Sequence, residues 1–188
     1  MKKLLSLLLA AVLACALVGC GSADTNNDNA GIADAKELLT TVWAAHADDE
    51  KFATFGGDMD EANMTQDAPG NFGIADAEVL DSMLGYPAAE VGKIDGAASL
   101  IHMMNANTFT VGAYHVVNAD DVAAVADALK ENIANRQWMC GFPDKMVIVT
   151  VDDYVVAMFG AAELVDNFNA KLTGAYTAAE VVCDEALL

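Results

Sequence analysis

The sequence predicts a single α+β domain built on a four-stranded, mainly antiparallel sheet. Two pairs of apolar runs are each separated by a short polar turn, a pattern typical of β-hairpins. Each pair is followed by apolar residues at helical spacing, and two further helical patterns precede the first pair. The predicted order is therefore ββαββα, with N-terminal helices packed on the sheet.

The N-terminal half of the domain predicts two helices. Residues 33–47 place their apolar side chains on one side, and residues 76–84 form a shorter helix with Gly85 at its end and Pro87 beyond it. Between them, residues 48–73 lose all periodicity and fill with Asp, Gly and Asn. This acidic segment predicts a long surface stretch, or one short helix among loops.

The first hairpin is predicted from the apolar runs 99–104 and 109–117, which a short polar turn separates. Asn118 is a good N-cap for the helix that follows, because a short polar side chain can accept hydrogen bonds from the first free amides. The inward face of that helix is predicted to consist of Val122, Val125, Ala126, Leu129 and Ile133.

The second hairpin is predicted from residues 146–151 and 154–159, with a turn at Asp152 and Asp153, and a last helix covers residues 161–172. In this hairpin both alternating sets of side chains are largely apolar, which argues against a sheet face open to water. We expect helices to cover both faces; the alternative is that one face docks a partner.

Composition narrows the functions that the protein can have. The 188 residues include 28 acidic and 9 basic side chains, for a formal net charge of −19. Such a charge repels phosphate backbones, so no nucleic-acid partner is expected. Because 55% of the residues are hydrophobic and their pattern is regular, the acidity does not indicate disorder.

The N-terminus has the layout of a secretory signal. Lys2 and Lys3 precede the apolar stretch 4–18, which is short for a membrane span but typical of a signal peptide. The stretch ends in Leu-Val-Gly-Cys at residues 17–20, which resembles the lipobox of bacterial lipoproteins. The resemblance implies cleavage before Cys20 and a lipid anchor, with acyl chains such as palmitate, on that thiol. An ordinary secretory signal with an incidental cysteine is the alternative.

These features divide the chain into three parts. Residues 1–19 are predicted to be the lipoprotein signal peptide, residues 20–31 the lipidated cysteine and a flexible tether, and residues 32–188 a single α+β domain. A coil of the tether's length has a mean span of about 20 Å. The predicted location is the extracytoplasmic face of the cell membrane, held there by the lipid.

Residues 84–172 resemble a domain-of-unknown-function family found in lipoproteins of Gram-positive anaerobes. The matching pieces, in chain order, are Leu84-Gly85-Tyr86, Met103-Met104-Asn105-Ala106, the Asn-Ala-Asp-Asp helix start at 118–121, Arg136-Gln137, Phe142-Pro143, and Tyr154-Val155-Val156. The resemblance implies lipoprotein status and a similar fold. It implies no activity and no site residue.

No catalytic residue is predicted. Ser22, Ser82 and Ser99 lack the glycine-flanked elbow of serine hydrolases. His102 and His115 do not belong to an HExxH motif, and the predicted hairpin places them too far apart for one zinc ion, so we interpret them as half-buried strand histidines.

Cys140 and Cys183 are the cysteines of the predicted domain, and they are candidates for a disulfide outside the cytoplasm. Closing their loop would stabilise the fold by about 4 kcal/mol on the chain-entropy model. The alternative is that both thiols stay reduced and that Cys140 is a small core residue.

A metal site is not predicted, although Asp58, Asp60 and Glu61 are weak candidates for calcium ligands in the acidic segment. The segment departs from the EF-hand pattern because it lacks both the central glycine and the closing glutamate. No cofactor is expected, since no glycine-rich phosphate loop is present.

The sequence therefore favours a non-catalytic binding or interaction module of the cell envelope, tethered to the membrane and capable of meeting an envelope protein. One alternative is a cell-wall or nutrient-processing enzyme that uses carboxylates as acid and base. A second alternative is a calcium-stabilised surface protein.

Overall fold

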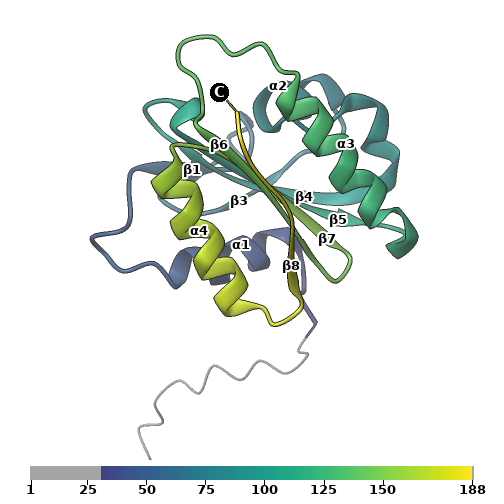
Figure 1. Cartoon of the computed structure of the whole chain (residues 1–188), viewed down its shortest axis with the longest axis horizontal. Coiled ribbons are helices and arrows are strands. Elements are labelled where there is room, and N and C mark those ends of the chain that lie inside the picture. The colour runs from purple at the N-terminus through teal and green to yellow at the C-terminus, as the bar shows by residue number, and fades with distance from the viewer. Residues whose placement is uncertain (1–30, 188) are drawn as a thin grey trace, which may run out of the picture.

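One antiparallel sheet of eight strands crosses the middle of the molecule (Figure 1). The computed structural model describes residues 31–187, so the predicted signal peptide, Cys20 and most of the tether lie outside the described residues. The helices are α1 (Ala35–Ala44), α2 (Ala77–Leu84), α3 (Val122–Ala134) and α4 (Ala162–Ala175), with short 3₁₀ turns at Ala88–Lys93, Ala106–Thr108 and Ala119–Asp121. The strands are β1 (Thr54–Gly56), β2 (Thr65–Gln66), β3 (Gly70–Phe72), β4 (Ile94–His102), β5 (Phe109–Val116), β6 (Lys145–Val151), β7 (Tyr154–Gly160) and β8 (Ala179–Ala186).

The protein is α+β, but the predicted four-stranded sheet in ββαββα order is wrong. The strand order is β2-β1-β4-β5-β7-β6-β8, and β3 pairs with β4 as well. The predicted hairpins form the four central strands, and the sequence did not indicate the outer ones. Strands β1, β2 and β3 have only two or three residues each, which is too few for an alternation of apolar and polar side chains to be recognised in the sequence.

Strand β8 was missed for a different reason. Only Cys183 is buried among its eight residues, because β8 lies at the edge of the sheet and presents acidic side chains to water. Its pairing with β6 is also interrupted by a register shift at Ile148 and Val149. A charged, irregular edge strand discourages further strand addition, but it leaves no apolar pattern in the sequence.

Two interlocking crossovers build the centre of the sheet. Strands β5 and β6 are parallel with β7 between them, and β7 and β8 are parallel with β6 between them. Each connection passes over one intervening strand, and both lead toward the β8 edge of the sheet. The strands from which they start, β5 and β7, run in opposite directions. The preference for right-handed crossovers therefore places α3 and α4 on opposite faces, as Figure 1 shows.

Each face of the sheet carries its own hydrophobic core. Helices α1 and α4 pack on the face that includes Val147, Val149 and Val151. Helices α2 and α3 pack on the face that includes Met146 and Ile148. The expectation that helices cover both faces of the second hairpin is thus confirmed, and the central strands are largely buried on both sides.

The helix starts and stops follow local chemistry. Asp34 caps α1 by accepting a hydrogen bond from the amide of Glu37, and Asp76 caps α2 in the same way. Gly85 ends α2 with a φ of 72°, in the left-handed region that glycine adopts easily. The cap at Asp34 fixes the point where the chain enters the fold.

Candidate functional site

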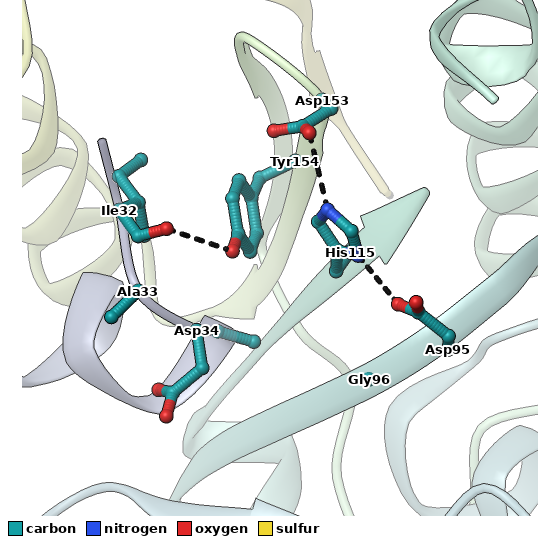
Figure 2. Close-up of a pocket in the computed structure, with 9 residues that line it drawn as sticks. Ile32, Ala33, Asp34, Asp95, Gly96, His115, Asp153 and Tyr154 are labelled. Carbon is teal, nitrogen blue, oxygen red and sulfur yellow. Dashed lines mark hydrogen bonds and ion pairs between the residues drawn. The ribbon is translucent and has the colours of Figure 1, made fainter. Parts of the chain in front are cut away.

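A pocket of about 370 Å³ lies where the chain enters the domain. The segment from Ile32 to Ala35 forms one wall, and the ends of three strands form the other (Figure 2). The strand ends supply Asp95 from β4, His115 from β5, and Asp153 with Tyr154 from the β6–β7 turn. Residues far apart in sequence thus meet at one end of the sheet.

His115 is held between two carboxylates. Its Nδ1 lies 2.5 Å from Asp95 Oδ1, and its Nε2 lies 3.1 Å from Asp153 Oδ2 (Figure 2). Asp95 can reach the ring because the pairing of β4 with β5 shifts register between Ile94 and Gly96, and a bulge of this kind re-aims a side chain. His115 therefore links the first hairpin to the turn of the second.

The two carboxylates raise the pKa of His115. The hydrogen bond with Asp95 has the larger effect, burial opposes it, and the bond with Asp153 adds to the increase. A neutral imidazole has one N–H and can donate to one carboxylate, whereas the protonated ring donates to both. The arrangement is therefore complete only when His115 is charged.

The other polar groups of this pocket are also engaged. The Tyr154 hydroxyl donates to the Ile32 carbonyl at 3.3 Å, and burial together with the Asp153 charge raises the pKa of Tyr154 to about 12. Asp34 accepts from the Glu37 amide at 2.7 Å, and Figure 2 shows its carboxylate turned away from His115. This pocket fastens the entering chain to the sheet, and its hydrogen bonds leave no unpaired acid and base facing each other.

Two loops meet at the opposite end of the sheet. The side-chain amide of Asn107 donates to the carbonyls of Met139 and Gly141, both at 2.9 Å. The amide of Asn105 donates to the Cys140 carbonyl at 3.0 Å. These three bonds join the β4–β5 connection to the loop between α3 and β6.

The joined loops expose four large apolar side chains, which we call the apolar loop end. Their exposed fractions are 83% for Met104, 79% for Met139, 66% for Phe142 and 45% for Met103. Apolar groups of this size usually leave water when a fold offers a core, and clusters that stay exposed mark interaction sites. Methionine side chains suit such sites because they adapt to different partners.

The apolar loop end and the entry pocket lie at opposite ends of the molecule. Strand β5 begins at Phe109 beside the joined loops and reaches His115 at the pocket, a separation of about 20 Å at the rise of a strand. Figure 1 shows the loop after α3 on the side opposite the start of α1. A chain that enters at Ile32 therefore leaves the apolar loop end facing away from its point of attachment.

The weak calcium candidates lie in the turn that follows β1. Asp58 is buried, and its carboxylate accepts hydrogen bonds from the Gly73 amide, the Asp60 amide and Asn63. Burial alone raises the pKa of Asp58, but the hydrogen bonds outweigh it and leave that pKa below its usual value. Asp58 thus organises the acidic segment, while Asp60 and Glu61 are exposed. In residues 31–187 no three His, Cys, Asp or Glu side chains group as metal ligands.

The two cysteines of the domain are separate free thiols. Cys140 is exposed in the loop after α3, and Cys183 is the buried residue of β8. The structure therefore shows neither the candidate disulfide nor a core position for Cys140. Cys183 packs in the core instead, where burial raises the pKa of its thiol.

The histidines are dispersed. His102 and His115 are half-buried at opposite ends of the first hairpin, as expected, and His102 stacks on Phe52 with ring centroids 5.2 Å apart. His46 is buried beside Trp43 and Phe168, and burial lowers its pKa. The Nδ1 of His46 donates to the Val42 carbonyl at 3.0 Å, one helical turn earlier in the chain.

Sequence reasoning missed both ends as sites. Asp95, His115 and Asp153 are separated by 20 and 38 residues, so no local spacing indicates that they meet. The apolar loop end left a weak signal, because Met103 and Met104 lie directly before a predicted turn and need not be buried.

Comparison of the chain with protein-family models, with curated proteins and with solved structures gives no match. Within the part of the chain that the structure describes, no helix has both the length and the apolar character needed to span a bilayer.

Proposed function

We propose that this protein is a lipid-anchored module of the cell envelope that binds a protein partner through its apolar loop end. In this proposal the lipoprotein signal directs the protein out of the cytoplasm, and lipid on Cys20 holds it at the extracytoplasmic face of the membrane. It is a binding role and involves no catalytic step.

The exposure of Met103, Met104, Met139 and Phe142 on two joined loops is the observation that carries the proposal. Burying one such side chain on binding is favourable by about 1.5 to 3 kcal/mol before the entropy of association is subtracted. The bonds from Asn107 hold the loops together before a partner arrives, which lowers the cost of ordering them.

Two observations favour a protein over a lipid surface as the occupant. The apolar loop end lies on the far side from Ile32, where the tether would join the domain. In addition, the net charge of −19 disfavours close approach to anionic headgroups. A protein that stands in the envelope can reach this end without that repulsion.

Site-specific crosslinking in intact cells tests the proposal. A photoactivatable residue placed at Met104 or Met139 should give a discrete adduct with an envelope protein, identifiable by mass spectrometry. The matched control is the same group at Asp127, an exposed residue on the outer side of α3. Adducts of equal strength at Asp127 would contradict the proposal.

Three further measurements separate the parts of the proposal. The variant Phe142→Gln should weaken the adduct at Met104, because it removes exposed apolar surface without touching a buried contact. A mature domain lacking lipid that binds phosphatidylglycerol vesicles through Met104 would show that the occupant is a membrane. Intact-mass analysis of the membrane fraction tests lipidation of Cys20, with Cys20→Ala as its control.

The two alternatives remain predictions. A carboxylate enzyme needs two acids free to act on a substrate, whereas Asp95 and Asp153 both bond to His115. A calcium-stabilised protein predicts a melting temperature that rises in millimolar calcium, through the candidates Asp58, Asp60 and Glu61.

A further inference from the structure

A second, smaller pocket lies beside the joined loops, on the face of the sheet that α2 and α3 cover. Its volume is about 190 Å³, larger than the cavity of about 150 Å³ that holds benzene in an engineered protein. Four of its walls are apolar: Phe55, Met83, Ile101 and Phe159. Their arrangement offers a compact apolar group a place out of water.

Arg136, the only arginine of the chain, also lines this pocket. It follows α3, and its guanidinium packs on the rings of Trp138 and Phe159, at 5.2 and 6.0 Å from their centroids. Its Nη2 donates to the Ser82 carbonyl, whereas its Nη1 is buried without a hydrogen-bond partner. No described carboxylate lies within ion-pair distance of it, although the protein is strongly acidic.

An unpaired, partly buried guanidinium is costly in a folded protein. A buried polar group without a partner loses its hydration without compensation, and a charged group loses more than a neutral one. Burial lowers the pKa of Arg136, and the charge of Asp81 offsets this only in part, but a guanidinium stays protonated. Nη1 is itself closed to solvent, so a bound anion would reach the guanidinium through its other N–H groups, which can form charge-assisted hydrogen bonds.

We propose that this pocket binds a monocarboxylate whose carboxyl group pairs with Arg136 and whose apolar body lies among Phe55, Met83 and Ile101. A guanidinium recognises the two oxygens of a carboxylate in one plane. The apolar walls reject a hydrated or strongly polar body. The net charge of −19 disfavours a second negative charge on the same ligand.

The carboxylate can come from a free acid or from the C-terminus of a peptide chain. Isothermal titration of the mature chain with phenylacetate probes the first source. A pentapeptide ending in phenylalanine, compared with its C-terminally amidated form, probes the second. Binding of phenylacetate alone would assign the site to a free acid, and tighter binding of the peptide acid would assign it to a chain terminus.

Three variants and one neutral isostere make the test decisive. Arg136→Gln and phenylacetamide should each weaken binding about tenfold or more, because each removes the charge-assisted pair. Met83→Trp should abolish binding by filling the pocket while leaving Arg136 in place. Lys36→Gln removes one positive charge on α1, away from the pocket, and should leave the affinity unchanged.

The result that overturns the proposal is equally clear. Equal affinity for phenylacetate and phenylacetamide, or unchanged affinity in Met83→Trp, would show that the pocket does not select a carboxylate. No saturable binding of either acid would do the same. Met83→Trp keeps the test valid if Arg136→Gln fails to fold, because the half-buried Met83 does not contribute to the polar network.

Discussion

His115 shows how a single side chain can join parts of the sheet that the sequence leaves apart. It lies at the end of β5 and bonds to carboxylates on β4 and on the β6–β7 turn. Because the pKa of His115 is raised in the folded protein, protonation and folding are linked. The sign of that linkage sets the pH range in which the contact matters.

We expect His115→Gln to destabilise the protein mainly at mildly acidic pH. A histidine with a raised folded pKa contributes its full stabilisation below its unfolded pKa of about 6.5, and this is lost as pH rises through the folded value. The loss should be about 1 kcal/mol or less, since both carboxylates are about half exposed. Urea unfolding from pH 5 to 9 measures it.

The paired variant Asp95→Asn with Asp153→Asn serves as the control for this titration. It should lose the same pH-dependent stability as His115→Gln. Adding His115→Gln to this variant should then cause no further loss. His46 titrates in all of these proteins and therefore cancels in the difference. A stability difference that grows with increasing pH would contradict the assignment.

The two thiols should differ sharply in reactivity. Cys140 is exposed and Cys183 is buried with a raised pKa, so a thiol reagent should label Cys140 in the native protein and Cys183 only after unfolding. Mass spectrometry after timed labelling measures both rates. If both thiols resist labelling and become reactive only after a reductant is added, the two cysteines form the disulfide instead.

At the scale of elements, two glycines with opposite environments test the packing of β7 and α4. Gly160 ends β7 with a φ of 151°, and a Cβ there would lie 2.3 Å from the Thr108 carbonyl oxygen. Gly160→Ala should therefore destabilise the protein by about 2 kcal/mol or more. Gly174 lies in α4 with open space around it, so Gly174→Ala should stabilise it by about 0.5 to 1 kcal/mol. Denaturant unfolding of both variants is the measurement, and equal effects would contradict the structure.

The joined loops are a second feature of this scale. Asn107→Ala removes two hydrogen bonds to the loop after α3 without opening the core. We expect faster amide exchange in residues 137–143 and little change in the global unfolding free energy. Asn135→Ala, which loses a local bond to the Glu131 carbonyl, is the matched control. Unchanged exchange in residues 137–143 would show that Asn107 does not hold this loop.

At the scale of the whole molecule, charge opposes compactness. The 188 residues carry a net charge of −19, and the excess acidic side chains repel one another more strongly in the folded state, where they are closer together, than in the unfolded chain. Raising sodium chloride from 10 to about 500 mM shortens the screening length and should raise the melting temperature by several degrees. The gain should largely vanish near the sequence pI of about 4.1. A melting temperature independent of salt at pH 7 would contradict this balance.

The sequence by itself determined the central hairpins, the four α-helices and the covered faces of the sheet, because apolar periodicity records which side of an element meets the core. It also predicted the lipoprotein address, which the described residues do not test. Gly85 was predicted to end its helix and does so, because the end of a helix depends on neighbours along the chain.

Only the tertiary structure decided the sheet's outer strands and both ends of the molecule. Strand β8 is an exposed edge with one buried residue, Cys183, so it has no apolar signature. Asp95, His115 and Asp153 meet because antiparallel pairing brings strand ends together, and Arg136 lines a pocket because α2 closes over it. Such contacts depend on distance in space, which the order of residues along the chain does not record.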